Sequence, residues 1–381
     1  MIIELRGVEF VNKGAELMLH AIIEELKQRI PEVEFAMEAG SRTPKEKLAS
    51  NGILMKTNFK KFGFNLSPIL NILPKPLLRS KNMVADQEIT AVLDGSGFAF
   101  GDKWGAKKAG ERSANHIRNW KAEGKKVILL PQAFGPFTSQ DLVEKMQVIL
   151  NQADLIFARD EKSLSYLNGL TSNSINLRLA PDFTNLLHPG HSLNNGSYQN
   201  RIAIIPNQKM LETDKEDQNH LYPSYLEAVV SILQNRGESP FFLIHESRKD
   251  GQISDLVNSK LGNRIDVIRE DDPLKVKGII GASKAVVTSR FHGLVSALSQ
   301  CVPSLSTGWS HKYQELLKDY DYQEGLCEVS VDENYLESKI NLILDPAKRE
   351  EIIAKLQSNT LIQKERTKEM WYEVTSVLVD K

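Results

Sequence analysis

The sequence predicts an α/β protein with two Rossmann-like, parallel-sheet domains that face each other across a cleft. Three observations predict this fold class. Short apolar runs alternate with segments of helical period along most of the chain, the pattern of parallel strands joined by crossover helices. This alternation stops once, in a stretch rich in Gly, Ser and Asn, and then restarts. With 381 residues, the chain is also longer than one hydrophobic core usually requires.

The first half of the chain contains apolar runs that predict strands and amphipathic segments that predict helices. Strands are expected at residues 2–5, 34–37, 91–93, 127–130 and 155–158. A helix is expected at 15–29, where Leu19, Ile22 and Leu26 fall on one face, and a second at 139–152. Asp160 is expected to cap a helix that runs to Leu167. We therefore assign residues 1–190 to an N-terminal, acceptor-binding domain.

Residues 188–200 are expected to form a linker, because they combine Pro and Gly with Ser and Asn. Beyond it, strands are expected at 202–205, 241–244, 265–268, 285–289 and 304–306, and helices at 222–236, 253–261, 273–281 and 294–300. The C-terminal domain is expected to span 200–355. The last thirty residues have a helical pattern, and a helix at 360–381 is expected to return to the first domain.

The composition argues against several classes of protein. The 48 basic and 49 acidic residues give a net charge of −1 without a long basic stripe, so nucleic acid is not expected as the partner. Cys301 and Cys327 are too few for a disulfide framework and lack metal-ligand spacing. Neither a signal-peptide pattern nor a membrane-spanning apolar run stands out. The expected location is cytoplasmic.

Residues 57–82 mix aromatic and aliphatic side chains with Lys and Arg. Such a mixture is able to dock on an anionic membrane surface. An apolar insertion that packs on the first domain or covers the cleft would have the same composition. Peripheral contact with the inner face of a membrane is therefore kept as an open alternative for this segment.

The strongest candidate for a functional site is the sequence Ser-Arg-Phe-His-Gly at residues 289–293. It joins the expected strand at 285–289 to the expected helix at 294–300, and ligands of parallel sheets bind at such strand ends. The guanidinium of Arg290 suits a carboxylate or phosphate, and the imidazole of His292 can transfer a proton near neutral pH. The motif predicts an anion site, although a solvated Arg and His on a surface loop would give the same sequence.

Other strand ends supply further candidates for binding a substrate. The turn Gly95-Ser96-Gly97 allows backbone amides to approach a phosphate, but its spacing fits neither a dinucleotide fingerprint nor a P-loop. The remaining candidates are single residues beyond strands, namely Arg159, Asn207, His245, His311 and Lys312. Each candidate also has a purely structural alternative. The turn at 95–97 needs glycine for its backbone conformation, Arg159 would form a surface ion pair, and His245 would be a core histidine.

Six short blocks, taken in order, resemble the polysaccharide pyruvyl transferase family. They are Asn-Lys-Gly-Ala-Glu at 12–16, Asp-Gly-Ser-Gly at 94–97, Leu-Pro-Gln-Ala-Phe-Gly-Pro at 130–136, Ala-Arg-Asp-Glu-Lys-Ser at 158–163, Pro-Asp-Phe at 181–183, and the block at 289–293. Ala15 departs from the family pattern, because relatives often carry Asp after the glycine. No catalytic role is therefore assigned to that first block.

The resemblance implies a GT-B-like architecture and an enzyme of exopolysaccharide biosynthesis. Such an enzyme moves the pyruvyl group of phosphoenolpyruvate onto a sugar of a bacterial-type surface polysaccharide or its precursor, forms a ketal and releases phosphate. The resemblance implies His292 as the catalytic residue, Arg290 and Phe291 in the donor site and Arg159 as a second anion ligand. Phosphoenolpyruvate is then a substrate, the acceptor is a sugar or a lipid-linked saccharide, and neither cofactor nor metal is expected.

The chemistry of phosphoenolpyruvate fits these residue types. Its carboxylate and phosphate call for two cationic groups, which Arg159 and Arg290 would supply from the two domains. His292, with an ordinary pKa of about 6.5, suits delivery of a proton to the C3 methylene. The base that accepts the proton of the attacking hydroxyl stays open among Glu246, Asp94 and His245. Loss of His292 should stop turnover, and loss of Arg290 should mainly weaken donor binding.

Two other functions are compatible with the same elements. A glycosyltransferase that uses a nucleotide sugar would share the two-domain architecture, but no acidic pair for a ribose stands out in the second domain. A non-catalytic carbohydrate-binding protein would have no need of a titratable histidine beside an arginine. Stabilisation by phosphoenolpyruvate or by a UDP-sugar would distinguish these functions.

Overall fold

The computed structural model describes residues 1–57, 60–61, 64–65, 73–172, 175–189, 197–214, 216–246 and 249–380. Contacts divide the chain into two compact units. Unit 1 consists of residues 1–11, 18–183 and 366–381, and unit 2 consists of residues 12–17 and 184–365. Each unit is built on its own parallel sheet, so the predicted α/β class with two sheets is confirmed.

The sheet of unit 1 has nine strands, eight of which follow the order β11-β10-β9-β7-β1-β2-β3-β6, while β8 pairs with β9. All of these pairs are parallel. The strands are β1 (Ile2–Arg6), β2 (Glu34–Met37), β3 (Ile53–Lys56), β6 (Met83–Val84), β7 (Ala91–Asp94), β8 (Phe98–Phe100), β9 (Lys126–Phe134), β10 (Leu155–Ala158) and β11 (Leu177–Leu179). A separate antiparallel pair joins β4 (Lys60–Lys61) to β5 (Phe64–Asn65).

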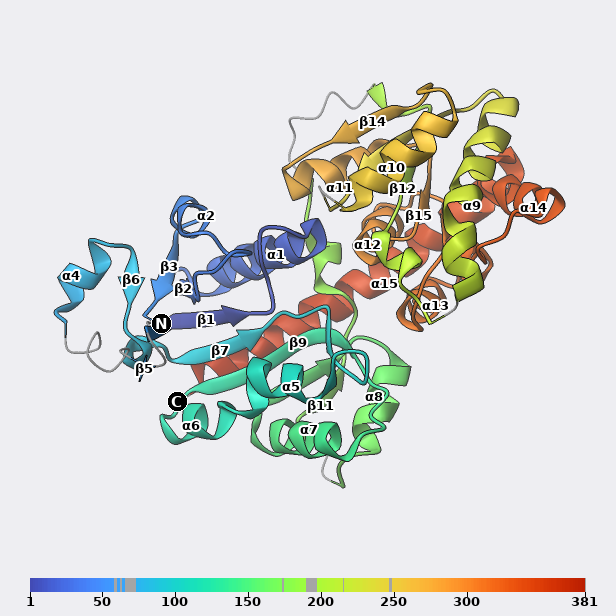
Figure 1. Ribbon diagram of the computed structural model, residues 1–381. Coiled ribbons are helices and arrows are strands. Elements are labelled where there is room, and N and C mark those ends of the chain that lie inside the picture. The colour runs from blue at the N-terminus through green and yellow to red at the C-terminus, as the bar shows by residue number, and fades with distance from the viewer. Residues whose placement is uncertain are drawn as a thin grey trace. The chain divides into compact units, whose positions relative to one another are not determined.

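Helices connect the strands of this sheet (Figure 1). They are α1 (Lys13–Arg29), α2 (Lys45–Ser50), α4 (Lys75–Arg79), α5 (Gly105–Ala109), α6 (Ile117–Ala122), α7 (Gln140–Gln152) and α8 (Glu161–Asn168). A π-helical stretch, Gly110–Ala114, separates α5 from α6. The carboxylate of Asp160 accepts a hydrogen bond from the backbone of Ser163 at 2.7 Å, which confirms the predicted cap of α8.

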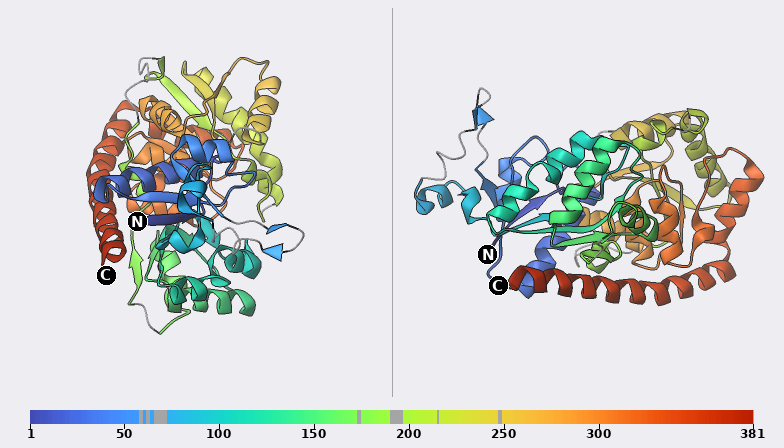
Figure 2. Two further views of the ribbon diagram at one scale, coloured as in Figure 1. Left: turned by 90° about the vertical axis from the view of Figure 1, so that its left-hand side faces the viewer. Right: turned by 90° about the horizontal axis from the view of Figure 1, so that it is seen from below.

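Unit 2 contains a five-stranded parallel sheet in the order β14-β13-β12-β15-β16. Its strands are β12 (Arg201–Ile205), β13 (Ser239–Ile244), β14 (Asp266–Arg269), β15 (Ala285–Thr288) and β16 (Ser304–Ser306). Its helices are α9 (Glu216–Asn235), α10 (Lys249–Lys260), α11 (Pro273–Ala282), α12 (Phe291–Leu298), α13 (Lys312–Asp319) and α14 (Glu333–Leu344), followed by α15 (Pro346–Val379). Figure 2 shows α15 as one unbroken helix.

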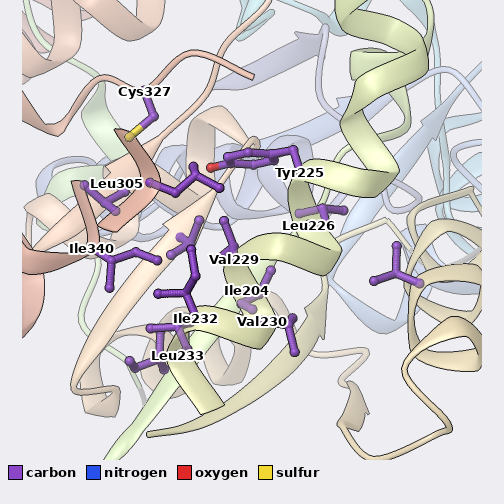
Figure 3. Packing of buried hydrophobic residues seen from close by; sticks show 14 of the residues in the cluster. Ile204, Tyr225, Leu226, Val229, Val230, Ile232, Leu233, Leu305, Cys327 and Ile340 are labelled. Carbon is purple, nitrogen blue, oxygen red and sulfur yellow. The ribbon is translucent and has the colours of Figure 1, made fainter. Parts of the chain in front are cut away.

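The core of unit 2 forms where α9 packs on the sheet. Apolar residues recur along α9 at helical spacing, and Figure 3 shows Tyr225, Val229 and Leu233 of this face near Ile204 of β12. Cys327 is also a buried member of this cluster. Burial of each such aliphatic side chain stabilises the fold by roughly 1.5–3 kcal/mol. This packing holds β12 and β15 in place, and their carboxyl ends carry the candidate site.

Both sheets have a point at which the order of the strands reverses. In unit 1 the chain builds outward from β1 through β2, β3 and β6, and then crosses to β7 on the other side of β1. In unit 2 it builds from β12 through β13 and β14, and then crosses to β15 on the other side of β12. Ligands of open α/β sheets bind beyond the carboxyl ends of the strands at such reversals. In this protein such positions are the ends of β1 and β7 in unit 1 and the ends of β12 and β15 in unit 2.

Several expectations from the sequence differ from the structure. Helix α12 begins at Phe291 rather than at 294, so His292 lies in its first turn. Helix α9 begins at Glu216 rather than at 222, so His220 lies inside it. The contact boundary falls between Phe183 and Thr184, not within 188–200, and the part of α15 that belongs to unit 1 begins at Arg366. Much of the proposed membrane segment 57–82 and of the linker 188–200 lies outside the described residues.

Candidate functional site

Ser289, directly beyond β15, is held by a dense set of hydrogen bonds. Its hydroxyl accepts a bond from the Tyr222 hydroxyl at 2.8 Å and lies 2.6 Å from the hydroxyl of Thr307. Its carbonyl accepts bonds from Asn207 Nδ2 at 2.8 Å and from the Tyr313 hydroxyl at 2.9 Å. Strand β15 therefore ends in a fixed position, and the motif that follows it begins from a rigid support.

Arg290 is buried and bound to carboxylates of its own unit. Its Nε donates to Asp250 Oδ2 at 2.8 Å, and its Nη2 donates to Asp250 Oδ1 at 2.5 Å and to Glu246 Oε2 at 3.0 Å. Burial lowers the pKa of Arg290, but Asp250 and Glu246 outweigh that effect and leave the pKa raised. Burial pushes the pKa of Asp250 upward, yet two-point contact with a guanidinium favours the ionised carboxylate.

This arrangement changes what is expected of Arg290. The hydrogen bonds to Asp250 and Glu246 are donated by Nε and Nη2 of Arg290, and Nη1 takes part in none of these three bonds. Asp250, which has no exposed side-chain surface, also accepts bonds from the backbone of Gln208 and Glu246 at 3.0 Å each. Arg290 therefore ties the ends of β12, β13 and β15 together through Asp250. A role as an anion ligand stays a prediction, and it would fall to Nη1.

His292 lies in the first turn of α12 and is partly exposed. Its ring lies directly against Gly14, near the start of α1. A Cβ atom at residue 14 would approach His292 Cγ to 2.8 Å and Nδ1 more closely still. Phe291 packs edge-on against the imidazole, with ring centroids 5.5 Å apart. The ring thus contacts both a glycine and an aromatic side chain, which limits the orientations open to it.

The start of α1 belongs by its contacts to unit 2. Asn12 accepts a hydrogen bond from the backbone of Gly14 at 2.9 Å. Lys13 pairs with Glu16 at 2.9 Å and donates a hydrogen bond to the carbonyl of Asp271. Hence two helix N-termini, those of α1 and α12, meet at His292. Helix N-termini favour bound anions, because their first N–H groups lack partners within the helix.

Lys312 extends this region from the start of α13. Its ammonium lies 4.5 Å from the ring centroid of Trp309, 5.1 Å from that of Phe291 and 5.5 Å from that of Tyr313. Such aromatic neighbours attract a cation and restrict its position. His311 is the residue that precedes the helix. The predicted roles of Lys312 and His311 in donor binding stay predictions, and Lys312 at least lies beside the motif.

His245 follows β13 and is buried. Burial, and secondarily the charges of Arg290, His292 and Lys13, hold its pKa well below the ordinary value of 6.5. Its Nδ1 has no hydrogen-bond partner among the described residues. His245 is therefore buried, as the alternative of a core histidine predicts. The charges of Arg290 and His292 that act on it place it in the same region as the motif.

The other predicted residues fall in different surroundings. Asn207 is buried, and its side chain accepts a bond from the backbone of Lys209 at 3.0 Å besides its bond to Ser289. Its described contacts thus shape the end of β12. Arg159 belongs to unit 1, where it is buried and bound to Asp182 at 3.0 Å. Gly95, Ser96 and Gly97 form the turn after β7, also in unit 1.

Sequence reasoning missed three components of the site. Asp250 gave no signal, because a single Asp at the start of a helix is common and its partner lies far along the chain. Tyr222 was placed in a helix without a polar role, although it is buried and supports Ser289. Gly14 was quoted only as part of a family-like block and given no role. The signal in the sequence is the glycine itself, because any larger side chain at residue 14 would clash with the ring of His292.

Two absences apply to the described part of the chain. Those residues contain no group of three or more His, Cys, Asp or Glu side chains able to hold a metal ion. Within the same residues, no helix combines the length and the apolar character that crossing a membrane requires.

The buried imidazole of His245 is expected to make the fold sensitive to acid. Its pKa in the folded protein is well below 6.5, so between these two values the unfolded chain binds a proton that the folded chain does not. The free energy of unfolding is then unaffected by this group above about pH 6.5 and falls as the pH decreases toward the folded-state pKa. Each pH unit of that window costs up to about 1.4 kcal/mol.

Urea unfolding near pH 7.5 and near pH 5.5 measures this effect. The loss of stability on acidification should be smaller in the variant His245→Gln than in the wild type. The variant His116→Gln serves as the comparison, because partial burial and the charge of Arg6 also lower the pKa of His116, but less than the pKa of His245 is lowered, so this variant should change the pH dependence less. An equal pH dependence in the wild type and in His245→Gln would contradict the expectation.

Comparison with solved structures places the fold in a class. The S. aureus MnaA-UDP co-structure matches with a TM-score of 0.60 and 12% identity, covering 99% of this chain and 96% of that one. Anabaena Alr3699/HepE in complex with UDP-glucose matches with a TM-score of 0.61 and 12% identity, covering 98% and 100%. The UDP-GlcNAc 2-epimerase from Neisseria meningitidis bound to UDP-GlcNAc gives 0.62 and 11%, covering 98% and 99%. At these identities the likeness establishes the fold alone, the GT-B-like class of α/β proteins with two parallel sheets.

The family follows from the sequence itself. The profile of the family described as polysaccharide pyruvyl transferase matches residues 12–311. That range covers most of the chain, so the protein belongs to the polysaccharide pyruvyl transferase family. A comparison with curated proteins gave no match. The matched range includes both Gly14 and His292.

Proposed function

We propose that this protein transfers the pyruvyl group of phosphoenolpyruvate to a sugar of a surface polysaccharide or of its lipid-linked precursor. The observation that carries the proposal is the placement of His292 against Gly14, where α1 and α12 begin. An anionic donor held at these helix N-termini would lie within reach of a titratable imidazole. Membership of the pyruvyl transferase family supports this donor and this kind of acceptor.

His292 would act as the general acid. The imidazolium gives its proton to C3 of phosphoenolpyruvate, which leaves a cationic C2. A hydroxyl oxygen of the acceptor then bonds to C2 and gives its proton to the general base, which stays open among Glu246, Asp94 and His245. The oxygen of a second hydroxyl bonds to C2 as the bond from C2 to the phosphate oxygen breaks, which closes the ketal, and the proton of this second hydroxyl leaves with the phosphate. The contacts with Gly14 and Phe291 support this role, because they limit the orientations of the imidazole, and a fixed catalytic group loses less freedom when the substrate binds.

The charges around His292 point to how the donor would be held. Lys13 and Arg290 are paired with carboxylates, and Lys312 lies among aromatic rings. The proposed ligands of a dianion are Arg290 Nη1, Lys312 and the first N–H groups of α12 and α13, all of which lie near the motif. Arg159 remains a proposed second ligand from unit 1. This set contains no metal and no cofactor.

Thermal shift experiments with phosphoenolpyruvate, UDP-glucose and UDP-N-acetylglucosamine test the choice of donor. Phosphoenolpyruvate alone is expected to raise the melting temperature, and the shift should grow with its concentration by mass action. Inorganic phosphate serves as the control for weak anion binding. Stabilisation by a UDP-sugar without any response to phosphoenolpyruvate would favour a nucleotide-sugar glycosyltransferase instead.

The variant Gly14→Ala tests the placement of His292. The new methyl group would lie 2.8 Å from His292 Cγ, so the imidazole has to move. Displacement of a catalytic group by about 1 Å can lower a rate by roughly a hundredfold. We expect phosphate release to fall by a factor of that order. The fold should persist, because alanine is favoured over glycine in a helix by about 1 kcal/mol.

Gly169→Ala is the matched control for this variant. Gly169 ends α8 in a right-handed helical conformation, and a Cβ there would approach atoms no closer than 3.5 Å. Its rate of phosphate release should equal that of the wild type. Equal rates in both variants would show that the contact between residue 14 and His292 has no bearing on turnover.

A further inference from the structure

A second polar cluster lies at the strand reversal of unit 1, where β7 ends at Asp94 beside the later part of β9. It consists of Asp94, Ser96, Arg112 and Gln132. Asp94 Oδ1 accepts bonds from the backbone of Ser96 at 2.9 Å and from Gln132 Nε2 at 3.4 Å. Arg112 Nε lies 3.8 Å from Asp94 Oδ2. The cluster therefore gathers around a single carboxylate, next to the end of β1, which pairs with β7.

Each member of this cluster has a buried polar atom without a hydrogen bond among the described residues. These atoms are Asp94 Oδ2, Ser96 Oγ, Arg112 Nε and Gln132 Oε1. Asp94, Ser96 and Gln132 are each at most 3% exposed. A buried polar atom left unsatisfied costs about 1–3 kcal/mol, and such atoms are few in native proteins. Asp94 Oδ2 and Arg112 Nε face each other at 3.8 Å, too far for a hydrogen bond, so the four atoms share hydrogen-bonding capacity that a bound molecule would use.

The backbone that delivers Arg112 is unusual in the same place. Arg112 lies in the π-helical stretch Gly110–Ala114, and stretches of this kind occur frequently at functional sites. Arg6, at the end of β1, fixes the stretch by donating from Nε to the carbonyl of Arg112 at 3.0 Å and from Nη2 to that of Glu111 at 3.1 Å. The position of Arg112 beside Asp94 is therefore built into the fold.

The donor and acceptor types at the cluster restrict its ligand. An anion is disfavoured, because the central group is a carboxylate and Gln132 Oε1 is a second acceptor. A metal cation is disfavoured by the guanidinium of Arg112 beside the same carboxylate oxygen. What remains is a neutral molecule that both donates and accepts hydrogen bonds. A sugar hydroxyl does both, and two hydroxyls would satisfy all four atoms.

We propose that Asp94, Ser96, Arg112 and Gln132 bind two hydroxyl groups of the acceptor sugar. One hydroxyl donates to Asp94 Oδ2 and accepts from Arg112 Nε, and the other donates to Gln132 Oε1 and accepts from Ser96 Oγ. Gly97, Phe98 and Arg112 are partly exposed and form the border through which the sugar reaches these atoms, with the side-chain rotations that are common on binding. This inference rests on the proposed transfer to a sugar and names the residues that select it.

Saturation-transfer NMR without phosphoenolpyruvate tests this binding separately from the transfer reaction. The probes are the methyl glycosides of glucose, galactose, mannose, N-acetylglucosamine and N-acetylmannosamine. At least one of them is expected to bind the wild type. Asp94→Asn replaces an acceptor by a donor, and Gln132→Met removes the polar atoms at similar length. Each should weaken that binding at least about tenfold, as expected for a lost hydrogen bond to a charged or buried group.

Glu111→Gln is the matched control, because it changes a carboxylate to an amide in the same π-helical stretch at an exposed side chain. Its binding should equal that of the wild type. If Asp94→Asn does not fold, Ser96→Ala and Gln132→Met carry the test. The proposal is overturned if no glycoside binds the wild type, or if the variants bind it as the wild type does. A normal thermal shift with phosphoenolpyruvate in either case would leave the proposed donor standing.

Discussion

The variant His292→Ala is expected to release phosphate from phosphoenolpyruvate about 10²- to 10⁴-fold more slowly than the wild type, the usual contribution of a general acid. Loss of the imidazole removes the group that protonates C3. The affinity for phosphoenolpyruvate should change little, because the proposed ligands Arg290 and Lys312 and the starts of α12 and α13 remain. The rate is measured by phosphate release in the presence of acceptor, and the affinity by thermal shift.

A control separates this effect from the loss of any histidine. His116 is exposed and belongs to unit 1, where it stacks on Trp120. His116→Ala should turn over at the wild-type rate. Full activity of His292→Ala would remove His292 from the mechanism. If His292→Ala lost both its activity and its affinity for phosphoenolpyruvate, His292 would instead be assigned to donor binding.

The variant Arg290→Ala is expected to lower the free energy of unfolding by about 3–5 kcal/mol, the usual cost of removing one partner of a buried ion pair. Its partner Asp250 has no exposed side-chain surface and would be left as a buried carboxylate without its cation. Donor binding should weaken as well, because the ends of β12, β13 and β15 lose the side chain that joins them. Urea unfolding gives the first quantity and thermal shift with phosphoenolpyruvate the second.

Two comparisons make this result specific. The exposed pair of Arg269 and Asp255 in the same unit has a similar N–O distance of 2.6 Å, yet Arg269→Ala should cost less than about 1 kcal/mol. The double variant Arg290→Ala/Asp250→Ala should be more stable than the sum of the two single effects predicts, because the unpaired charge is gone. Additive effects, or a stable Arg290→Ala variant, would show that the pair contributes little to folding.

The sequence alone predicted the central strands well. β1, β2, β7, β9 and β10 are apolar runs bounded by turn residues, and all were expected close to where they lie. Strands β3, β6, β8 and β11 were missed. Three of them, β6, β8 and β11, have only two or three residues and so carry little periodicity. The π-helical stretch Gly110–Ala114 has no local signature from which to predict it.

The sequence identified the central residues of the candidate site but not the residues that they contact. Arg290 and His292 stand out because their residue types and their place after a strand suggest chemistry. What each contacts depends on residues that are distant in sequence: Asp250 for Arg290, and Gly14 for His292. Such pairs form only when the sheet assembles, so no local pattern encodes them. The helix start at Phe291 was likewise set by packing rather than by a capping residue, since Arg290 makes no side-chain cap.

The division of the chain has a consequence for its synthesis. Unit 1 takes its last piece from residues 366–381, where Trp371 is fully buried and packs edge-on against Phe183 with ring centroids 5.7 Å apart. Domains that are contiguous in sequence can fold as they leave the ribosome. Here the first half of the polypeptide has to wait, with part of its apolar surface uncovered, until translation reaches the final helix. A chaperone that binds nascent chains would find its target in that interval.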